Sequence, residues 1–155
     1  MIKVKTLMVY ESIHHGNTEK VAKVMADVLK AELVKAKELD INLVAEYDLL
    51  GFGSGIYWGK PHKDLLHTID SLPSLTNKQA FVFSTSGAGE KGSNKAHQLI
   101  KGKLIEKGFT IVGEFSCRGF DSFGLLKLIG GINKGRPNEH DLKEAEDFAR
   151  RWQNS

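Results

Sequence analysis

The sequence predicts an α/β fold in which helices cover both faces of a parallel sheet. Short apolar runs alternate along the chain with segments whose apolar residues recur every three or four positions, and these are the patterns of buried strands and amphipathic helices. The apolar runs are continuous, as expected of strands that are buried on both faces of a parallel sheet. Five strands and four helices in 155 residues suit a three-layer, doubly wound architecture, for which the strand order 2-1-3-4-5 is the simplest choice.

Each element is expected where its pattern is clearest. The strands are predicted at 6–10, 32–36, 47–53, 80–83 and 109–115. The helices are predicted from about Thr18 to Ala31, from Pro61 through Leu72, over 96–104 with an end at Gly108, and after Pro137 with Asn138 as the cap. Pro61 suits the first turn of its helix because an N–H group has no helical partner there.

The composition is that of one ordinary globular domain spanning residues 1–155, with 41% hydrophobic and 26% charged residues. The net charge of +3 is spread along the chain and does not indicate nucleic-acid binding. No apolar run approaches the roughly 18 residues of a membrane span, and the first residues do not form a signal peptide. We therefore expect no membrane insertion and a cytoplasmic location. The single cysteine, Cys117, excludes an internal disulfide and a zinc site made of cysteines, and is expected to be a buried, inert thiol.

In an open parallel sheet, ligands bind beyond the carboxyl ends of the strands, where the strand order reverses. The segment 12–18, after the first predicted strand, contains a glycine and several hydroxyl and amide side chains and leads into a helix. The N–H groups of a first helical turn bind phosphate; the alternative is an ordinary helix cap by Asn17 or Thr18. The adjacent His14 and His15 do not indicate a metal site, because neighbouring side chains diverge and no third ligand follows at a suitable spacing.

Two more segments are expected at the same edge. In 53–60, the adjacent aromatic residues Tyr57 and Trp58 lie between glycines; they can stack on a planar ligand or fold onto the domain's own surface. The segment 84–92 includes the string G-x-G-x-x-G. That fingerprint binds dinucleotides after the first strand of a Rossmann half, not after a fourth strand. We interpret it instead as a donor-rich loop around a flat ligand, or as a flexible connector.

These residues together resemble a known family. The segments SIHHGNTEK, GSGIYWGK and STSGAGEKG are similar, in order and in spacing, to the phosphate loop and the two ring-binding loops of flavodoxins. The resemblance covers essentially the whole chain. It implies a flavodoxin-like fold, non-covalently bound FMN, and one-electron or hydride chemistry at the flavin.

The resemblance also implies a role for each matching residue. The phosphate would be bound by Ser12, Ile13, His14, His15, Gly16, Asn17 and Thr18. One face and the reactive edge of the ring would be flanked by Ser54, Gly55, Ile56, Tyr57, Trp58, Gly59 and Lys60. The pyrimidine side of the ring would be hydrogen-bonded by Thr85, Ser86, Gly87 and Gly89.

The chain departs from typical flavodoxins in three ways. Its phosphate segment is one residue longer and has histidines in place of threonines, and its second ring segment has Ser86 and Ala88 where an aromatic residue is common. Its pI of about 8.9 is basic, unlike that of acidic flavodoxins. Cations expected near the ring, where they would stabilise an anionic reduced flavin, are Lys60, Lys91, Arg118, Lys127, Lys134 and Arg136.

The resemblance implies an electron carrier that shuttles low-potential electrons between redox partners. Such a carrier needs no catalytic residues of its own. Its partners are expected to have an acidic docking face. The alternative is an oxidoreductase in which NAD(P)H or a quinone stacks on the open face of the bound FMN. A flavin-free module is the third possibility, which both glycine-rich segments oppose. The stretch 118–136 fits no regular element; it is expected to be a lid or docking surface, or else a short helix packed on the domain's edge.

Overall fold

The computed structural model describes residues 4–12, 16–87, 90–119 and 135–153. Five parallel strands form the sheet, in the order β2-β1-β3-β5-β6. Their bounds are β1 Thr6–Glu11, β2 Glu32–Lys35, β3 Leu49–Tyr57, β5 Lys78–Ser86 and β6 Phe109–Arg118. This order is the predicted 2-1-3-4-5. The short β4, Lys60–Pro61, pairs antiparallel with the end of β3.

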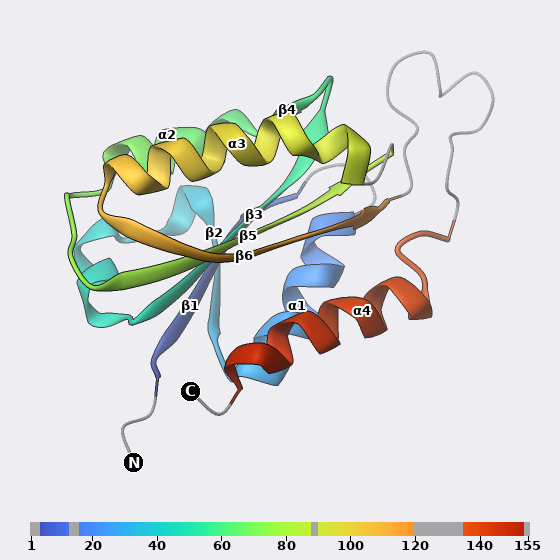
Figure 1. Ribbon diagram of the computed structural model, residues 1–155, viewed down its shortest axis with the longest axis horizontal. Coiled ribbons are helices and arrows are strands. Elements are labelled where there is room, and N and C mark those ends of the chain that lie inside the picture. The colour runs from blue at the N-terminus through green and yellow to red at the C-terminus, as the bar shows by residue number, and fades with distance from the viewer. Residues whose placement is uncertain (1–3, 13–15, 88–89, 120–134, 154–155) are drawn as a thin grey trace.

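Helices cover both faces of the sheet, which makes the fold three-layered as predicted (Figure 1). One face is covered by α1 (Asn17–Leu29) and α4 (Glu139–Ala149), and the other by α2 (Lys63–Ser71) and α3 (Glu90–Glu106). Two short 3-10 helices, Ala36–Glu38 and Ile41–Glu46, connect β2 to β3, and a third, Arg150–Trp152, extends α4. Asn138 caps α4, as its position in the sequence predicts.

The pleat of the strands divides the core into two layers. All six residues of β1 are buried, and successive side chains of a strand point to opposite faces. Leu7 and Val9 accordingly pack toward α2 and α3, whereas Met8 and Tyr10 pack toward α1 and α4. Trp152 joins the second layer, where its ring stacks on Phe81 with centroids 5.0 Å apart. Strands that are apolar on both faces are therefore required by this architecture.

The structure corrects several predicted boundaries. The third and fourth predicted strands continue to Tyr57 and Ser86, because neighbouring strands pair with most of these residues. Pro61 does not lie in the first turn of α2. It is the last residue of β4, opposite Ile56, and α2 begins at Lys63 with His62 as its cap. A proline is tolerated there because it lies on a short strand at the edge of the pairing.

The carboxyl ends of the strands, the start of α1 and the start of α3 lie at one end of the molecule (Figure 1). The order of the strands reverses between β1 and β3, since the chain passes from β1 outward to β2 and then returns to β3. No helix within the described ranges is long and apolar enough to cross a membrane.

Candidate functional site

The first site segment follows β1 and leads into α1. Gly16 precedes the helix with φ +61° and ψ +30°, in the left-handed region that favours glycine, and no described residue lies within 4 Å of the position that a Cβ would occupy. Asn17 and Thr18 do not cap the helix, because they are its first residues. Instead the hydroxyl oxygen of Ser12 accepts a hydrogen bond from the Glu19 N–H at 3.3 Å. Within the described part of the chain, the side-chain position of Gly16 at the beginning of α1 is therefore unoccupied.

The first and third site segments meet through their hydroxyl groups. Thr18 is buried in the first turn of α1, and its Oγ1 lies 2.9 Å from Oγ1 of Thr85 on β5. These residues are 67 positions apart in the chain. Gly119, just beyond β6, donates its N–H to the Ser86 carbonyl at 3.2 Å and packs against the Asn17 side chain. The ends of β5 and β6 and the start of α1 are thus joined at one place.

The second site segment is a β-hairpin rather than a loop. β3 ends at Tyr57, Trp58 and Gly59 form the turn, and Lys60 begins β4. Trp58 and Gly59 both have positive φ angles, of 55° and 77°. The Ser54 hydroxyl is buried below the hairpin, where it donates to the Gly55 carbonyl at 2.6 Å and accepts from the His62 N–H at 2.8 Å. Ser54 therefore ties the start of the hairpin to the start of α2.

The two aromatic residues of the hairpin behave differently. The Tyr57 side chain folds back over Gly55, and its ring contacts His62 edge-on with centroids 6.0 Å apart. Trp58 is 77% exposed at the tip of the hairpin. Its exposed ring is a candidate surface for a planar ligand. Of the two alternatives that the sequence left open, Tyr57 follows the surface-packing one.

The third site segment ends β5, and its side chains point to alternate faces of the sheet. Thr85 faces α1, as described above, whereas Ser84 faces α3. Ser84 Oγ is hydrogen-bonded to Ser93 Oγ at 2.9 Å and to His97 Nε2 at 2.6 Å. His97 Nδ1 lies 3.0 Å from the Glu114 carboxylate, which Lys101 also contacts at 2.7 Å. A polar chain therefore runs from half-buried Lys101 inward to the end of β5.

His97 is 4% exposed, and burial lowers its pKa although the Glu114 carboxylate acts in the opposite direction. Burial also raises the pKa of Glu114, but hydrogen bonds from Lys101 and His97 outweigh it, so the net pKa is lowered. The Ser84 hydroxyl donates its single proton to Ser93 Oγ, so Ser84 Oγ is the acceptor toward Nε2–H of His97. The sequence did not reveal this network, because its members come from β5, α3 and β6.

We expect the free energy of unfolding to decrease as the pH falls below 6.5, the ordinary pKa of histidine. Below that pH the unfolded chain takes up a proton that folded His97 resists, and the loss continues until the pH reaches the lower pKa of the folded state. Urea unfolding at about pH 7.5 and about pH 5.5 measures the effect. The His97→Gln variant should show a smaller decrease than the native chain, and an equal decrease in both would contradict this assignment.

The expected cluster of cations is only partly supported. Arg118 lies at the end of β6, where its Nη1 is 3.4 Å from the Gly87 carbonyl oxygen, and Lys60 is exposed on the hairpin. Arg136 does not contribute, because it forms a two-pronged ion pair with Asp141 of α4. The other expected cations lie outside the described residues, or have side chains that do: Lys91, Lys127 and Lys134.

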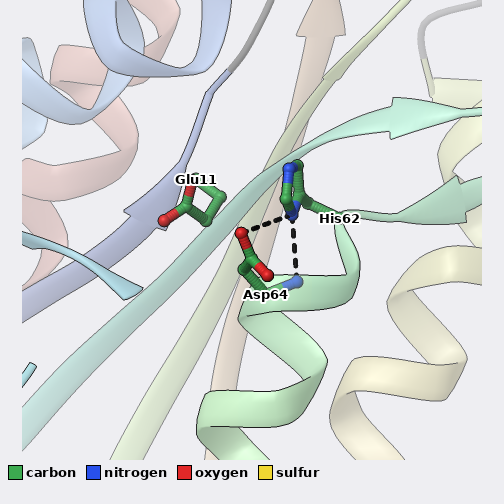
Figure 2. A group of neighbouring side chains, drawn as sticks. All are labelled: Glu11, His62 and Asp64. Atoms are coloured by element: carbon green, nitrogen blue, oxygen red, sulfur yellow. Dashed lines mark hydrogen bonds and ion pairs between the residues drawn. The ribbon is translucent and has the colours of Figure 1, made fainter. Parts of the chain in front are cut away.

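Other predictions have different outcomes. Cys117 is buried among apolar side chains, as expected, and burial raises the pKa of its thiol to about 12. The predictions for Ile13, His14, His15, Gly89 and most of 118–136 lie outside the described residues. Glu11 at the end of β1 also meets His62 and Asp64 at the start of α2, a cluster that the sequence did not reveal (Figure 2).

Comparisons with known proteins agree with this geometry. The family model described as "Flavodoxin domain" matches residues 7–127. The chain is 48% identical over 147 residues to an uncharacterized protein of Methanocaldococcus jannaschii, covering 95% of this chain and 97% of the relative. It is 31% identical to the flavodoxin-like domain-containing protein BilS of Clostridioides difficile, covering 88% of this chain and 79% of that protein.

Solved structures share the fold at low sequence identity. A flavodoxin from the domain Archaea superposes with a TM-score of 0.70 at 18% identity, and the match covers 96% of both chains. Oxidised flavodoxin 1 from Bacillus cereus gives a TM-score of 0.68 at 21% identity, with the same coverage of both chains. The strand order, the helices on both faces and the match of the family model over most of the sequence lead to one conclusion: this chain belongs to the flavodoxin family.

Proposed function

We propose that this protein binds FMN at the carboxyl edge of its sheet and carries electrons between redox partners. The observation that best supports the proposal is the hydrogen bond between Thr18 and Thr85, 2.9 Å long. It joins the segment proposed to bind phosphate to one proposed to bind the ring, across 67 residues of sequence. Segments that form one ligand site must meet in this way.

The residues around α1 fit a phosphate group. Gly16 leaves open space beside the first helical turn, where N–H groups and the helix dipole attract anions. Ser12 Oγ accepts from the Glu19 N–H, which leaves the hydroxyl proton of Ser12 to donate to a phosphate oxygen. The helical N–H groups and the Ser12 hydroxyl are neutral donors, and residues 11–19 contain no lysine or arginine.

The hairpin and the end of β5 fit a planar ring. Trp58 offers an exposed aromatic face, and Ser86 and Gly87 supply small residues with backbone donors and acceptors close to α1. FMN, when bound, supplies one-electron and two-electron redox chemistry, and the protein supplies binding, orientation and electrostatics. We assign the stacking role to Trp58 rather than Tyr57, because the Tyr57 ring packs against His62 and Gly55.

The charge of the site supports a particular class of partner. Arg118 lies beside Gly87 at the end of β5, and Lys60 lies on the hairpin. The whole chain carries a net charge of +3. Positive charge around the ring stabilises an anionic reduced flavin and attracts acidic surfaces. We therefore propose redox partner proteins with acidic docking faces, whose association weakens as salt concentration rises.

A second candidate function is direct reduction by NAD(P)H or a quinone. The feature that favours it is the end of β5, where Ser86 and Gly87 are small and no aromatic residue occupies the position common in flavodoxins. A ring bound there would keep one face accessible to a second planar molecule.

Titration of the purified chain with FMN tests the main proposal. We expect one equivalent to bind, with quenching of flavin fluorescence, and riboflavin to bind more weakly because it lacks the phosphate. Anaerobic mixing then separates the two functions: an electron carrier is reduced by dithionite and not rapidly by NADH or NADPH, whereas a reductase is reduced by a nicotinamide within seconds. A chain that binds neither FMN nor riboflavin would contradict both.

Gly16→Val is expected to weaken FMN binding by about tenfold or more, because its side chain fills the open space beside α1, while riboflavin affinity changes little. Gly135→Val is the matched control, since Gly135 also has a positive φ, of 79°, and open space around it. Both variants carry similar backbone strain, of about 1–2 kcal/mol. If Gly16→Val lost affinity for FMN and riboflavin equally, the assignment of the FMN phosphate to the start of α1 would be wrong.

A further inference from the structure

Three potential metal ligands meet on the face of the sheet covered by α2. Glu11 is the last residue of β1, His62 caps α2, and Asp64 lies in the first turn of that helix (Figure 2). One ligand atom from each lies within 4.8 Å of the others, and His62 Nδ1 is 3.7 Å from Asp64 Oδ2. We propose that these residues, the Glu11–His62–Asp64 cluster, bind a divalent first-row transition metal ion such as Zn²⁺.

The burial of Glu11 is the strongest support for a cation. Glu11 is 3% exposed, and in the described part of the chain its carboxylate accepts one long hydrogen bond, 3.4 Å from the Lys37 N–H. No lysine, arginine or histidine of the described ranges forms an ion pair with it. A buried carboxylate is costly unless it is paired or bound to a metal. A divalent ion between Glu11 and Asp64 supplies the missing charge.

The imidazole of His62 is held in place from several sides. The His62 N–H donates to Ser54 Oγ at 2.8 Å, and its Nδ1 accepts from the Asp64 N–H at 3.0 Å. The Tyr57 ring contacts it edge-on. These contacts hold Nδ1 beside Asp64, as Figure 2 shows. Preorganised ligands of this kind lose little conformational entropy on binding a metal.

The nature of the ligands selects the ion. Two carboxylates and one imidazole suit Zn²⁺, Mn²⁺, Fe²⁺ or Co²⁺, whereas Mg²⁺ and Ca²⁺ prefer oxygen ligands alone. Two contacts compete with metal binding. Lys37 Nζ lies 3.6 Å from Asp64 Oδ2 and competes with the metal for this carboxylate. The Asp64 N–H donates to His62 Nδ1 and competes for the lone pair of this nitrogen. We therefore expect reversible binding, weaker than at a closed structural zinc site, with Lys37 as the competing cation.

Metal binding at the cluster is expected to affect the hairpin formed by β3 and β4. Ser54 connects His62 to the beginning of the hairpin that carries Trp58. Binding at His62 should therefore restrain this hairpin and alter the fluorescence of Trp58. Trp152, the other tryptophan of the chain, packs on Phe81 at the opposite side of the sheet and should not respond.

Calorimetric titration of the full chain with Zn²⁺ tests the proposal without any flavin. The native chain should bind one equivalent, and Glu11→Gln and His62→Asn should each weaken it by about tenfold or more. Asparagine preserves the cap of α2, because its side-chain oxygen can accept the Asp64 N–H. His67→Asn, at an exposed position on the same helix, is the matched control and should bind as the native chain does.

Two further measurements separate this site from accidental binding. Lys37→Met should bind Zn²⁺ more tightly than the native chain, because the competing ammonium is removed, whereas a merely structural role for Lys37 predicts no change. A double variant, His14→Asn with His15→Asn, should leave the affinity intact. The proposal is overturned if the native chain binds no Zn²⁺, if His62→Asn binds it normally, or if the double variant is the one that loses it.

Discussion

Replacing Gly108 by alanine is expected to lower the free energy of unfolding by about 3 kcal/mol or more. Gly108 follows α3 with φ +100°, a conformation that residues with a side chain rarely adopt. A Cβ at this position would overlap the Leu75 carbonyl oxygen and lie 2.9 Å from the Leu75 carbonyl carbon. The backbone there cannot retreat easily, since the Leu75 N–H donates to the Lys107 carbonyl at 2.7 Å. Urea unfolding monitored by circular dichroism measures the change.

Gly102→Ala is the matched control and should have the opposite sign. Gly102 lies inside α3, is exposed, and has nothing within 4 Å of the position that a Cβ would occupy. Alanine there should stabilise the protein by about 1 kcal/mol, because glycine is a poor helix former. The result would contradict our account of Gly108 if both substitutions destabilised the chain to a similar extent.

The second large effect is expected at Asp141, at the start of α4. Asp141 is 2% exposed, accepts from the Asn138 N–H at 2.8 Å and from Arg136 Nη2 at 2.6 Å, and also pairs with Arg136 Nε. Asp141→Ala removes half of the capping box and leaves a half-buried guanidinium without its partner. We expect a loss of about 2–4 kcal/mol, measured by urea unfolding. Asp147→Ala, which breaks an exposed ion pair with Lys143 on the same helix, should cost less than about 1 kcal/mol.

The effect of Asp141 should depend on pH. Burial raises its pKa, but the hydrogen bonds from Arg136 and the Asn138 N–H more than offset this, so the net pKa lies below the ordinary 3.8. Its contribution is therefore present above that pH and is lost as the pH falls through the folded-state pKa. The difference in stability between the native chain and Asp141→Asn should diminish in the same range. A difference that stayed constant down to the acid transition would exclude the carboxylate charge as its source.

Most of the fold could be predicted because its signals are local. Continuous apolar runs identified the five strands of the parallel sheet, and alternation with helical stripes implied their order. Asn138 and Gly108 were correctly placed at the start of α4 and the end of α3. The hairpin was not foreseen, because Ser54–Tyr57 are held in β3 by pairing with β1, β4 and β5 rather than by their own β-propensity.

The candidate site was predictable as a location but not as a set of contacts. The topology places the ends of β1, β3 and β5 at one edge, and the sequence therefore indicated which segments meet there. It did not indicate that Trp58 is exposed while Tyr57 packs on His62, or that Arg136 is paired with Asp141. Each of these outcomes depends on a neighbour from another element.

The sequence by itself determined the succession of elements, because periodicity and turn residues act over a few positions, and the resemblance of three segments to flavodoxin loops indicated the family. The tertiary structure alone decided which polar side chains face one another. Ser84 and Thr85 are adjacent, yet the pleat directs one to His97 and the other to Thr18. Glu11 meets His62 and Asp64 only because β1 and β3 pair in a particular register, in which Glu11 lies beside Ser54. Register is set by the packing of the whole core, which no short stretch of sequence specifies.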